Sequence, residues 1–303
     1  MQIIIDCDPG IDDALALLLA AASAEIEILA VTTVTGNRPV AITSVNARKI
    51  LDLAGRSEIP VYAGAARSLA YGESRCNLVH GADGLGGVDL GSADRVETGQ
   101  AATRLIELLL EHPKKSVTLV AIGPLTNLAL AEMLSPGILS RAREVVIMGG
   151  ALRCPGNVTP AAEFNFYADP LAANIVVAAN ADLVMFPLDV TNEAVMSPEW
   201  IASFSDMGSA CGRAAAAMLE AYAELDPLLH DACPVAYLLD RTLFTGESCY
   251  LEVDWRPGAT EGHCLAWFAL PHHDTRVTNV MAMTTVRTEA LLEVVRSRIA
   301  VLP

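Results

Sequence analysis

The chain of 303 residues is long enough to bury a large core, and 52% of its residues are hydrophobic. Its formal net charge is −16, and no cluster of lysine and arginine interrupts the acidic residues. Such a surface repels polyanions, so we expect neither nucleic acid nor an anionic membrane as a partner.

The chain is expected to be cytoplasmic. No basic segment precedes its first apolar run, which is not typical of a secretory signal. The alanine- and leucine-rich stretch of residues 14–24 follows four aspartates and predicts a buried helix rather than a transmembrane span. Seven scattered cysteines without a Cys-x-x-Cys spacing are typical of reduced thiols rather than of disulfides or structural zinc.

Short apolar strands alternate with helical patterns through the first two thirds of the chain. The pattern predicts strands at residues 2–7, 28–34, 60–63, 117–122, 144–148 and 182–188, and helices at 12–22, 40–54, 99–111, 125–134 and 170–179. Residues 72–99, rich in glycine and polar residues, predict an extended loop able to close over a site.

The last third is helical in pattern from residue 197 to residue 240. It then predicts strands at 250–253, 265–270 and 277–283 and a final helix from residue 288. We therefore predict an α/β fold in which residues 1–303 form a single domain, with a mainly parallel central sheet flanked by helices.

Four aspartates crowd the end of the first predicted strand: Asp6, Asp8, Asp12 and Asp13. Open α/β sheets bind ligands in the crevice at this end of their strands. Taken alone, Asp12 and Asp13 also suit the first turn of a helix, where carboxylates complement the helix dipole. Together the four repel one another unless protons or a cation intervene. Because a flexible cage of oxygen ligands favours calcium, we predict a Ca²⁺ site here.

A second carboxylate candidate, Asp231, follows His230 directly before a helical stretch. As an isolated pair, these two residues more readily predict a helix N-cap beside a surface histidine.

The pattern Asp6-x-Asp8-Pro9-Gly10-x-Asp12-Asp13-Ala14 resembles the N-terminal signature of the inosine-uridine nucleoside hydrolase family. Further matches follow in order along nearly the whole chain: Thr35-Gly36-Asn37, His80-Gly81, Gly123-Pro124-Leu125-Thr126-Asn127, Val146-Ile147-Met148-Gly149-Gly150, Ala162-Glu163-Phe164-Asn165, Asp169-Pro170 and His230-Asp231. The resemblance implies a Rossmann-like nucleoside hydrolase fold, a ribonucleoside substrate, and a homodimer or homotetramer.

The resemblance also implies a role for each site residue. Calcium would be bound by the side chains of Asp8, Asp13 and Asp231 and by the backbone carbonyl of Ile122. The substrate residues would be Asp12, Asn37, Asn157, Glu163 and Asn165 on the ribose, Met148 packing near the sugar, and His80 and His230 facing the base. The family often has threonine where this chain has Ile122, which a carbonyl ligand tolerates.

The implied reaction is hydrolysis of the N-glycosidic bond to ribose and free base. A calcium-bound water would be activated by Asp8, and carboxylates would stabilise the positive charge that develops on the sugar. His230 is the candidate acid for the leaving base. The segment between Met218 and His230 is shorter than in relatives and keeps Tyr222 as its aromatic residue.

Two alternatives belong to other classes. An apolar strand ending in Asp-x-Asp also opens phosphatases of the haloacid dehalogenase type, but this chain has only three lysines to neutralise a phosphate. A nucleoside- or riboside-binding protein without turnover would need the same calcium and ribose contacts. The preferred base is not readable from the sequence.

Overall fold

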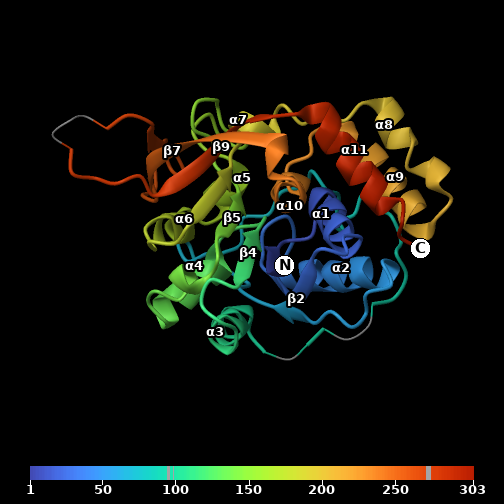
Figure 1. Cartoon of the computed structure of the whole chain (residues 1–303), viewed down its shortest axis with the longest axis horizontal. Coiled ribbons are helices and arrows are strands. Elements are labelled where there is room, and N and C mark those ends of the chain that lie inside the picture. Colours follow the sequence, from blue (N-terminus) through green and yellow to red (C-terminus); the bar gives the residue numbers. More distant parts are fainter. Residues whose placement is uncertain (94–95, 98, 271–273) are drawn as a thin grey trace.

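The computed structural model describes residues 1–93, 96–97, 99–270 and 274–303. Within them one nine-stranded sheet has the order β3-β2-β1-β4-β5-β6-β9-β7-β8 (Figure 1). The strands are β1 (Gln2–Cys7), β2 (Glu27–Thr33), β3 (Val61–Ala63), β4 (Val117–Ala121), β5 (Val145–Met148), β6 (Leu183–Phe186), β7 (Phe244–Val253), β8 (Cys264–Trp267) and β9 (Val280–Val286). The run from β3 to β9 is parallel, and β7 and β8 extend it antiparallel.

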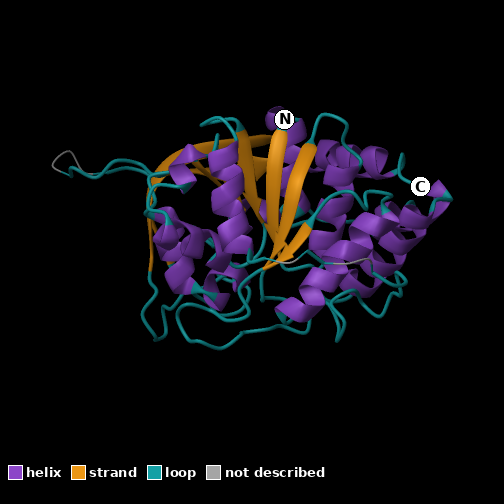
Figure 2. Cartoon of the chain, turned by 90° about the horizontal axis from the view of Figure 1, so that it is seen from below, coloured by secondary structure: helices purple, strands orange, loops and turns teal. Residues whose placement is uncertain are grey.

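Helices cover both faces of this sheet (Figure 2). Strand β1 shows why, because its alternate side chains enter different cores: Ile3 and Ile5 join one, and Ile4 joins the other. The first core packs under α1 (Ile11–Ala21), α2 (Val40–Leu53), α9 (Ala210–Ala223), α10 (Ala232–Leu239) and α11 (Thr288–Ile299). The second packs under α3 (Ala101–Glu111), α4 (Thr126–Leu134) and α6 (Pro170–Val177). Burial on both faces explains why the central strands are continuous apolar runs.

The predicted α/β fold with a mainly parallel sheet is confirmed, while the single domain stays a prediction. Strand and helix bounds in the first two thirds agree with the sequence pattern to within about two residues, the ordinary uncertainty of such boundaries. Within the described chain, no helix is long and apolar enough to cross a membrane.

Three local predictions were wrong. Strand β7 begins at Phe244 rather than at residue 250, because its first half alternates exposed polar residues that mask the strand pattern. Residues 197–240 are not continuously helical but break into α8 (Pro198–Ala202), α9 and α10. Two short helices were not predicted. The sequence pattern gave no element for α5 (Phe164–Ala168), and it extended a strand to residue 188, where α7 (Leu188–Thr191) begins.

The topology determines where a ligand can bind. From β1 the chain runs outward to β2 and β3, then returns to the other side of β1 as β4. The connections that leave β1 and β4 therefore diverge, which opens a crevice at the carboxyl ends of these two strands.

Asp169 is a buried junction between three segments of this fold. Its carboxylate accepts hydrogen bonds from Leu69 N (2.7 Å), Thr126 Oγ1 (2.7 Å), Ala70 N (3.3 Å) and, as the N-cap of α6, from Ala172 N (3.2 Å). It is 1% exposed, so water does not replace these bonds.

We predict that Asp169→Ala lowers the free energy of unfolding by about 2–4 kcal/mol, because it leaves several buried donors without a partner. Urea-induced unfolding measures this loss. Asp182→Ala is the matched control, because Asp182 is 69% exposed and pairs with Lys115 at the surface. We expect that control to cost under about 0.5 kcal/mol. Equal losses for the two variants would contradict the junction role.

Candidate active site

A cluster of buried carboxylates lies where β1 meets α1 and α10. Asp12, Asp13 and Asp231 each place a side-chain oxygen within 4.8 Å of the other two. They are 7%, 0% and 3% exposed, so solvent hardly screens their mutual repulsion. Asp8 is 1% exposed and stands beside this trio rather than in it.

The turn after β1 holds Asp13 through its backbone. Asp8 N and Gly10 N donate to the two carboxylate oxygens at 3.0 and 2.9 Å, and Asn37 Nδ2 adds a third bond at 3.1 Å. Asp13 is thus a member of the cluster, and it also accepts the hydrogen bonds of the backbone amides at the N-terminus of α1.

Asp8 is held between two glycine segments. Its Oδ2 accepts from Asn37 N at 2.5 Å, whereas Oδ1 is buried without a hydrogen-bond partner. A Cβ placed on Gly36 would lie 2.0 Å from Oδ2, and one on Gly123 would lie 2.3 Å from Oδ1. Both positions therefore require glycine, and the carboxylate of Asp8 keeps one oxygen available.

Burial raises the pKa of every carboxylate in the cluster. Desolvation is the largest cause, and it takes the pKa of Asp13 to about 7. The pKa values of Asp8 and Asp231 lie well above their usual range because burial is reinforced by the charges of neighbouring aspartates. Burial also raises the pKa of Asp12. Such a group is stable only with bound protons or a cation, and its oxygen donors suit a hard divalent ion.

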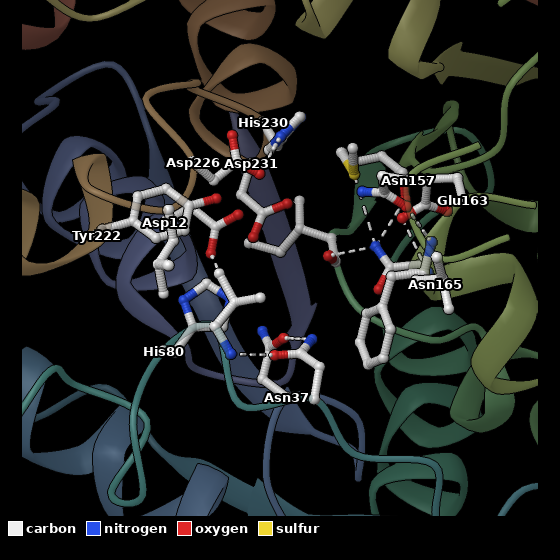
Figure 3. Close-up of a pocket in the computed structure, with 17 residues that line it drawn as sticks. Asp12, Asn37, His80, Asn157, Glu163, Asn165, Tyr222, Asp226, His230 and Asp231 are labelled. Atoms are coloured by element: carbon white, nitrogen blue, oxygen red, sulfur yellow. Dashed lines mark hydrogen bonds and ion pairs between the residues drawn. The ribbon is translucent and has the colours of Figure 1, made fainter. Parts of the chain in front are cut away.

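A pocket of about 230 Å³ opens onto this cluster (Figure 3). The predicted residues that line it are Asp12, Asn37, His80, Ile122, Met148, Asn157, Glu163, Asn165, His230 and Asp231. The structure thus brings together ten predicted residues from eight separate segments, with Asp8 and Asp13 behind them. Sequence reasoning missed Asn77, Val79, Val158, Phe164, Leu225 and Asp226, which complete the lining together with Tyr222.

One wall of the pocket is built from the start of α5. Glu163 is the N-cap, and its carboxylate accepts from the backbone amides of Asn165 (2.8 Å), Phe166 (3.2 Å) and Gly150 (2.8 Å). Asn165 Nδ2 donates to the carbonyls of Ile122 (2.9 Å) and Met148 (3.2 Å). This wall is therefore fixed by hydrogen bonds before any ligand arrives.

His80 contributes a neutral ring to the opposite wall. Ile11 N donates to its Nδ1 at 3.1 Å, which leaves the ring proton on Nε2, 3.7 Å from Asp12 Oδ1. The ring stacks on Tyr222 with centroids 5.1 Å apart. Because burial lowers the pKa of His80 to about 4, the ring is uncharged near neutral pH.

His230 is held at both ring nitrogens. Nδ1 lies 2.8 Å from Thr191 Oγ1, and Nε2 lies 3.3 Å from Asp226 Oδ2. Burial lowers the pKa of His230, but the hydrogen bond and charge of Asp226, together with the charges of Asp12 and Glu163, more than offset this, and the pKa is raised overall. Asp231 stands at the N-cap position of α10 as the alternative predicted, but it makes no side-chain cap bond, and His230 is 5% exposed, so the predicted surface histidine was wrong.

Known proteins share the sequence pattern that builds this pocket. The sequence profile of the inosine-uridine preferring nucleoside hydrolases matches residues 3–293. The chain belongs to this family. Membership makes the protein an N-glycosidase of the nucleoside hydrolase family rather than a phosphatase of the haloacid dehalogenase type.

Relatives and solved structures match over most of the chain. An inosine-uridine preferring nucleoside hydrolase of Leishmania major is 36% identical over 89% of this chain and 88% of its own. A pyrimidine-specific ribonucleoside hydrolase of Shewanella woodyi is 39% identical over 86% of both chains. The structure of a plant nucleoside hydrolase gives a TM-score of 0.92 at 32% identity over 99% of both chains. A purine-preferring ribonucleoside hydrolase from Gardnerella vaginalis gives 0.92 at 29% identity, over 99% of this chain and 98% of its own.

We predict that Ca²⁺ stabilises this nucleoside hydrolase more as the pH rises. Without a cation, the pKa of Asp13 is about 7, above the value of about 3.9 in an unfolded chain. The stability that Asp13 contributes is then fully present below about pH 4 and is lost as the pH rises to about 7. A cation replaces the proton and reverses this loss.

The measurement is the shift in melting temperature on adding Ca²⁺ to chelator-treated protein at about pH 5 and about pH 7.5. A larger shift at the higher pH is expected. A shift that is equal at both pH values, or larger in acid, would contradict competition between cation and protons.

Proposed function

We propose that the protein hydrolyses the N-glycosidic bond of ribonucleosides to ribose and free base with Ca²⁺ as its cofactor. The observation that carries this proposal is the pairing of two kinds of side chain around one pocket. Glu163, Asn165 and Asn157 line one side of it, and Asp12 faces them from beside the rings of His80 and Tyr222. The carboxylates and amides suit a sugar that becomes positively charged, and the rings of His80, Tyr222 and His230 suit a flat heterocycle.

The residues that would hold calcium are Asp8, Asp13 and Asp231 through their side chains and Ile122 through its carbonyl. The unpartnered Oδ1 of Asp8 and the side-chain oxygens of Asp13 and Asp231, within 4.8 Å of each other, support this assignment. Asp12 belongs to the same trio as Asp13 and Asp231, so a ribose held by Asp12 would lie next to the cation. When bound, calcium supplies positive charge that orients ribose hydroxyls and makes water more acidic.

Asp8 is the proposed proton acceptor for the attacking water. Its Oδ1 has no other hydrogen-bond partner, while Oδ2 is anchored by the amide of Asn37. An oxygen held in place in this way can take the proton without moving the carboxylate. Attack from the side of the sugar opposite the base needs no covalent intermediate.

The ribose would be gripped by Asp12, Asn37, Asn157, Glu163 and Asn165, with Met148 packed near the sugar. These side chains line the pocket. Positive charge that develops on the sugar is stabilised by Asp12 and Glu163, whose carboxylates are already oriented and do not need to reorganise.

His80 and His230 would face the base, with His230 as the acid for its departure. In this structure Nε2 of His230 is bonded to Asp226, so protonation of a base requires Asp226 to release that nitrogen. The side chain of Asp226 is 25% exposed, and its bond to His230 is longer than the one from Thr191. Asp226 therefore keeps the ring oriented until a base takes its place.

The test of the function is ribose release from inosine, uridine, cytidine, adenosine and guanosine. We expect free base and ribose in equal amounts, loss of turnover with a chelator, and recovery when Ca²⁺ is restored. Binding of ribosides without any ribose release would contradict the proposal. The panel also ranks the bases, which the relatives' differing preferences leave open.

We predict that Asp8→Ala abolishes turnover, because it removes a calcium ligand and the proton acceptor together. The rate is measured at saturating calcium and substrate, with circular dichroism as the check that the fold survives. A variant that keeps more than about a tenth of the wild-type rate would rule out Asp8 as the base.

His230→Ala should slow natural nucleosides by about a hundredfold or more, because their bases leave as protonated groups. It should have much less effect on p-nitrophenyl riboside, whose leaving group needs no proton. The measured quantity is the ratio of the two losses. His112→Ala is the control, because that ring binds the Leu108 carbonyl at the end of α3. Equal losses on both substrates would mean that His230 acts only by packing or by positioning Asp231.

A further inference from the structure

The pocket wall that carries Asn77 and His80 belongs to a segment without helix or strand. Residues 71–80 follow β3 and the Asp169 junction and run along the pocket mouth. Asn77 Nδ2 donates to Asn37 Oδ1 at 2.8 Å, so this segment also orients a predicted ribose ligand. A wall without regular backbone pairing needs side chains to hold it in place.

Arg75 reaches from this segment to the opposite wall. Its guanidinium lies between two rings, 3.8 Å from the centroid of Tyr71 and 4.3 Å from that of Tyr167. Its Nη1 donates to the backbone carbonyl of Tyr167 at 3.0 Å. Tyr167 lies in α5, the helix whose first residues carry Glu163 and Asn165 into the pocket.

Glu261 completes the junction. Its Oε1 accepts from Arg75 Nη1 at 2.6 Å and from the hydroxyl of Tyr71, and the residue is 8% exposed. The segment that carries Glu261 packs tightly on α5, because a Cβ on Gly262 would lie 3.2 Å from Tyr167 Cα. This ion pair has one buried partner, and its guanidinium also contacts two aromatic rings. Such a pair resists thermal opening better than an exposed pair.

We propose that Arg75 is a positioning residue that clamps the Asn77–His80 wall against α5 and so keeps the substrate pocket assembled before substrate binds. It touches no residue that the reaction uses directly. Its effect passes through the backbone of residues 76–80, which sets Asn77 against Asn37 and His80 against Ile11.

Loss of the clamp lowers the fraction of molecules with an assembled pocket, and apparent affinity falls in proportion to that fraction. Once substrate is bound, the wall is held by the substrate as well, so the chemical step changes little. Arg75→Gln should therefore raise KM by about tenfold and change kcat by less than about twofold. The same variant should speed amide hydrogen exchange across residues 72–80 by about tenfold.

Arg104→Gln is a matched control. The side chain of Arg104 is 27% exposed against 25% for Arg75, it pairs with Glu107 and Glu111, and its guanidinium lies 5.8 Å from the ring centroid of Tyr62. It lies on α3 and does not line the pocket. We expect its KM and its exchange in residues 72–80 to match wild type.

Two further variants separate clamping from general destabilisation. Glu261→Gln removes the negative charge from the other side of the ion pair, and combining it with Arg75→Gln should add little to either single effect, because both weaken the same contact. Arg75→Lys keeps the charge without the planar group that stacks between the rings, so KM and exchange should lie between wild type and Arg75→Gln.

The exchange measurement needs no turnover, so it tests the clamp even if the proposed reaction fails, whereas the KM measurement rests on that reaction. Unchanged exchange at residues 72–80 in both Arg75→Gln and Glu261→Gln would overturn the proposal. So would a fall in kcat at constant KM, or equal effects from Arg75→Gln and Arg104→Gln.

Discussion

The rest of the structure depends on the mutual repulsion of carboxylates that are buried together. Asp8, Asp12, Asp13 and Asp231 lie within one region of low exposure, and no lysine or arginine is among the described residues that line the adjoining pocket. Burial and neighbouring charge both raise their pKa values, so the ionised cluster cannot exist alone. A divalent cation would stabilise the ionised cluster by offsetting the repulsion between its carboxylates. The negative charges of these carboxylates would also stabilise a sugar that becomes positively charged.

Backbone groups provide most of the support for this cluster. The turn amides after β1 bind Asp13, the amide of Asn37 binds Asp8, and the amides at the start of α5 bind Glu163. Backbone donors at strand ends cannot swing away, which keeps this part of the pocket rigid. The side of the pocket that carries the histidines is different, because His80 comes from a segment without regular structure, and Asp226 is partly exposed. In the proposed reaction, the groups that break the bond would be fixed on the sheet, and those that recognise the base would lie on loops.

The sequence predicted pocket residues correctly where they lie in short, continuous motifs. The aspartates at the end of β1 stand next to an unmistakable buried strand, and Glu163, Asn165 and the His230–Asp231 pair are short motifs that the family resemblance matched in order. The sequence did not predict residues whose place at the pocket depends on contacts between distant or irregular segments. Nothing in the sequence indicates that the carboxylate of Asp226 binds the ring of His230, because the three residues between them are not helical. Arg75 likewise gains its partners from α5 and from the β7–β8 connection, which only the fold brings near. Asp12 and Asp13 were predicted as neighbours in a carboxylate cluster, but the closeness of Asp12 to Asp231, over two hundred residues away in the chain, is visible only in three dimensions.

The most direct test of the cluster's purpose is the stability of Asp231→Asn with and without calcium. Asp231 is 3% exposed and its side chain caps no helix amide, so the substitution removes an ionisable carboxyl without removing a helix cap. In a chelator the variant should be as stable as wild type or more stable, because the cluster then has one carboxyl fewer that must be kept protonated. In calcium it should be less stable than wild type, because a ligand is gone. The urea-unfolding free energies of both proteins in both conditions decide this. A variant that is less stable by the same amount with and without calcium would show that Asp231 serves the fold rather than a cation.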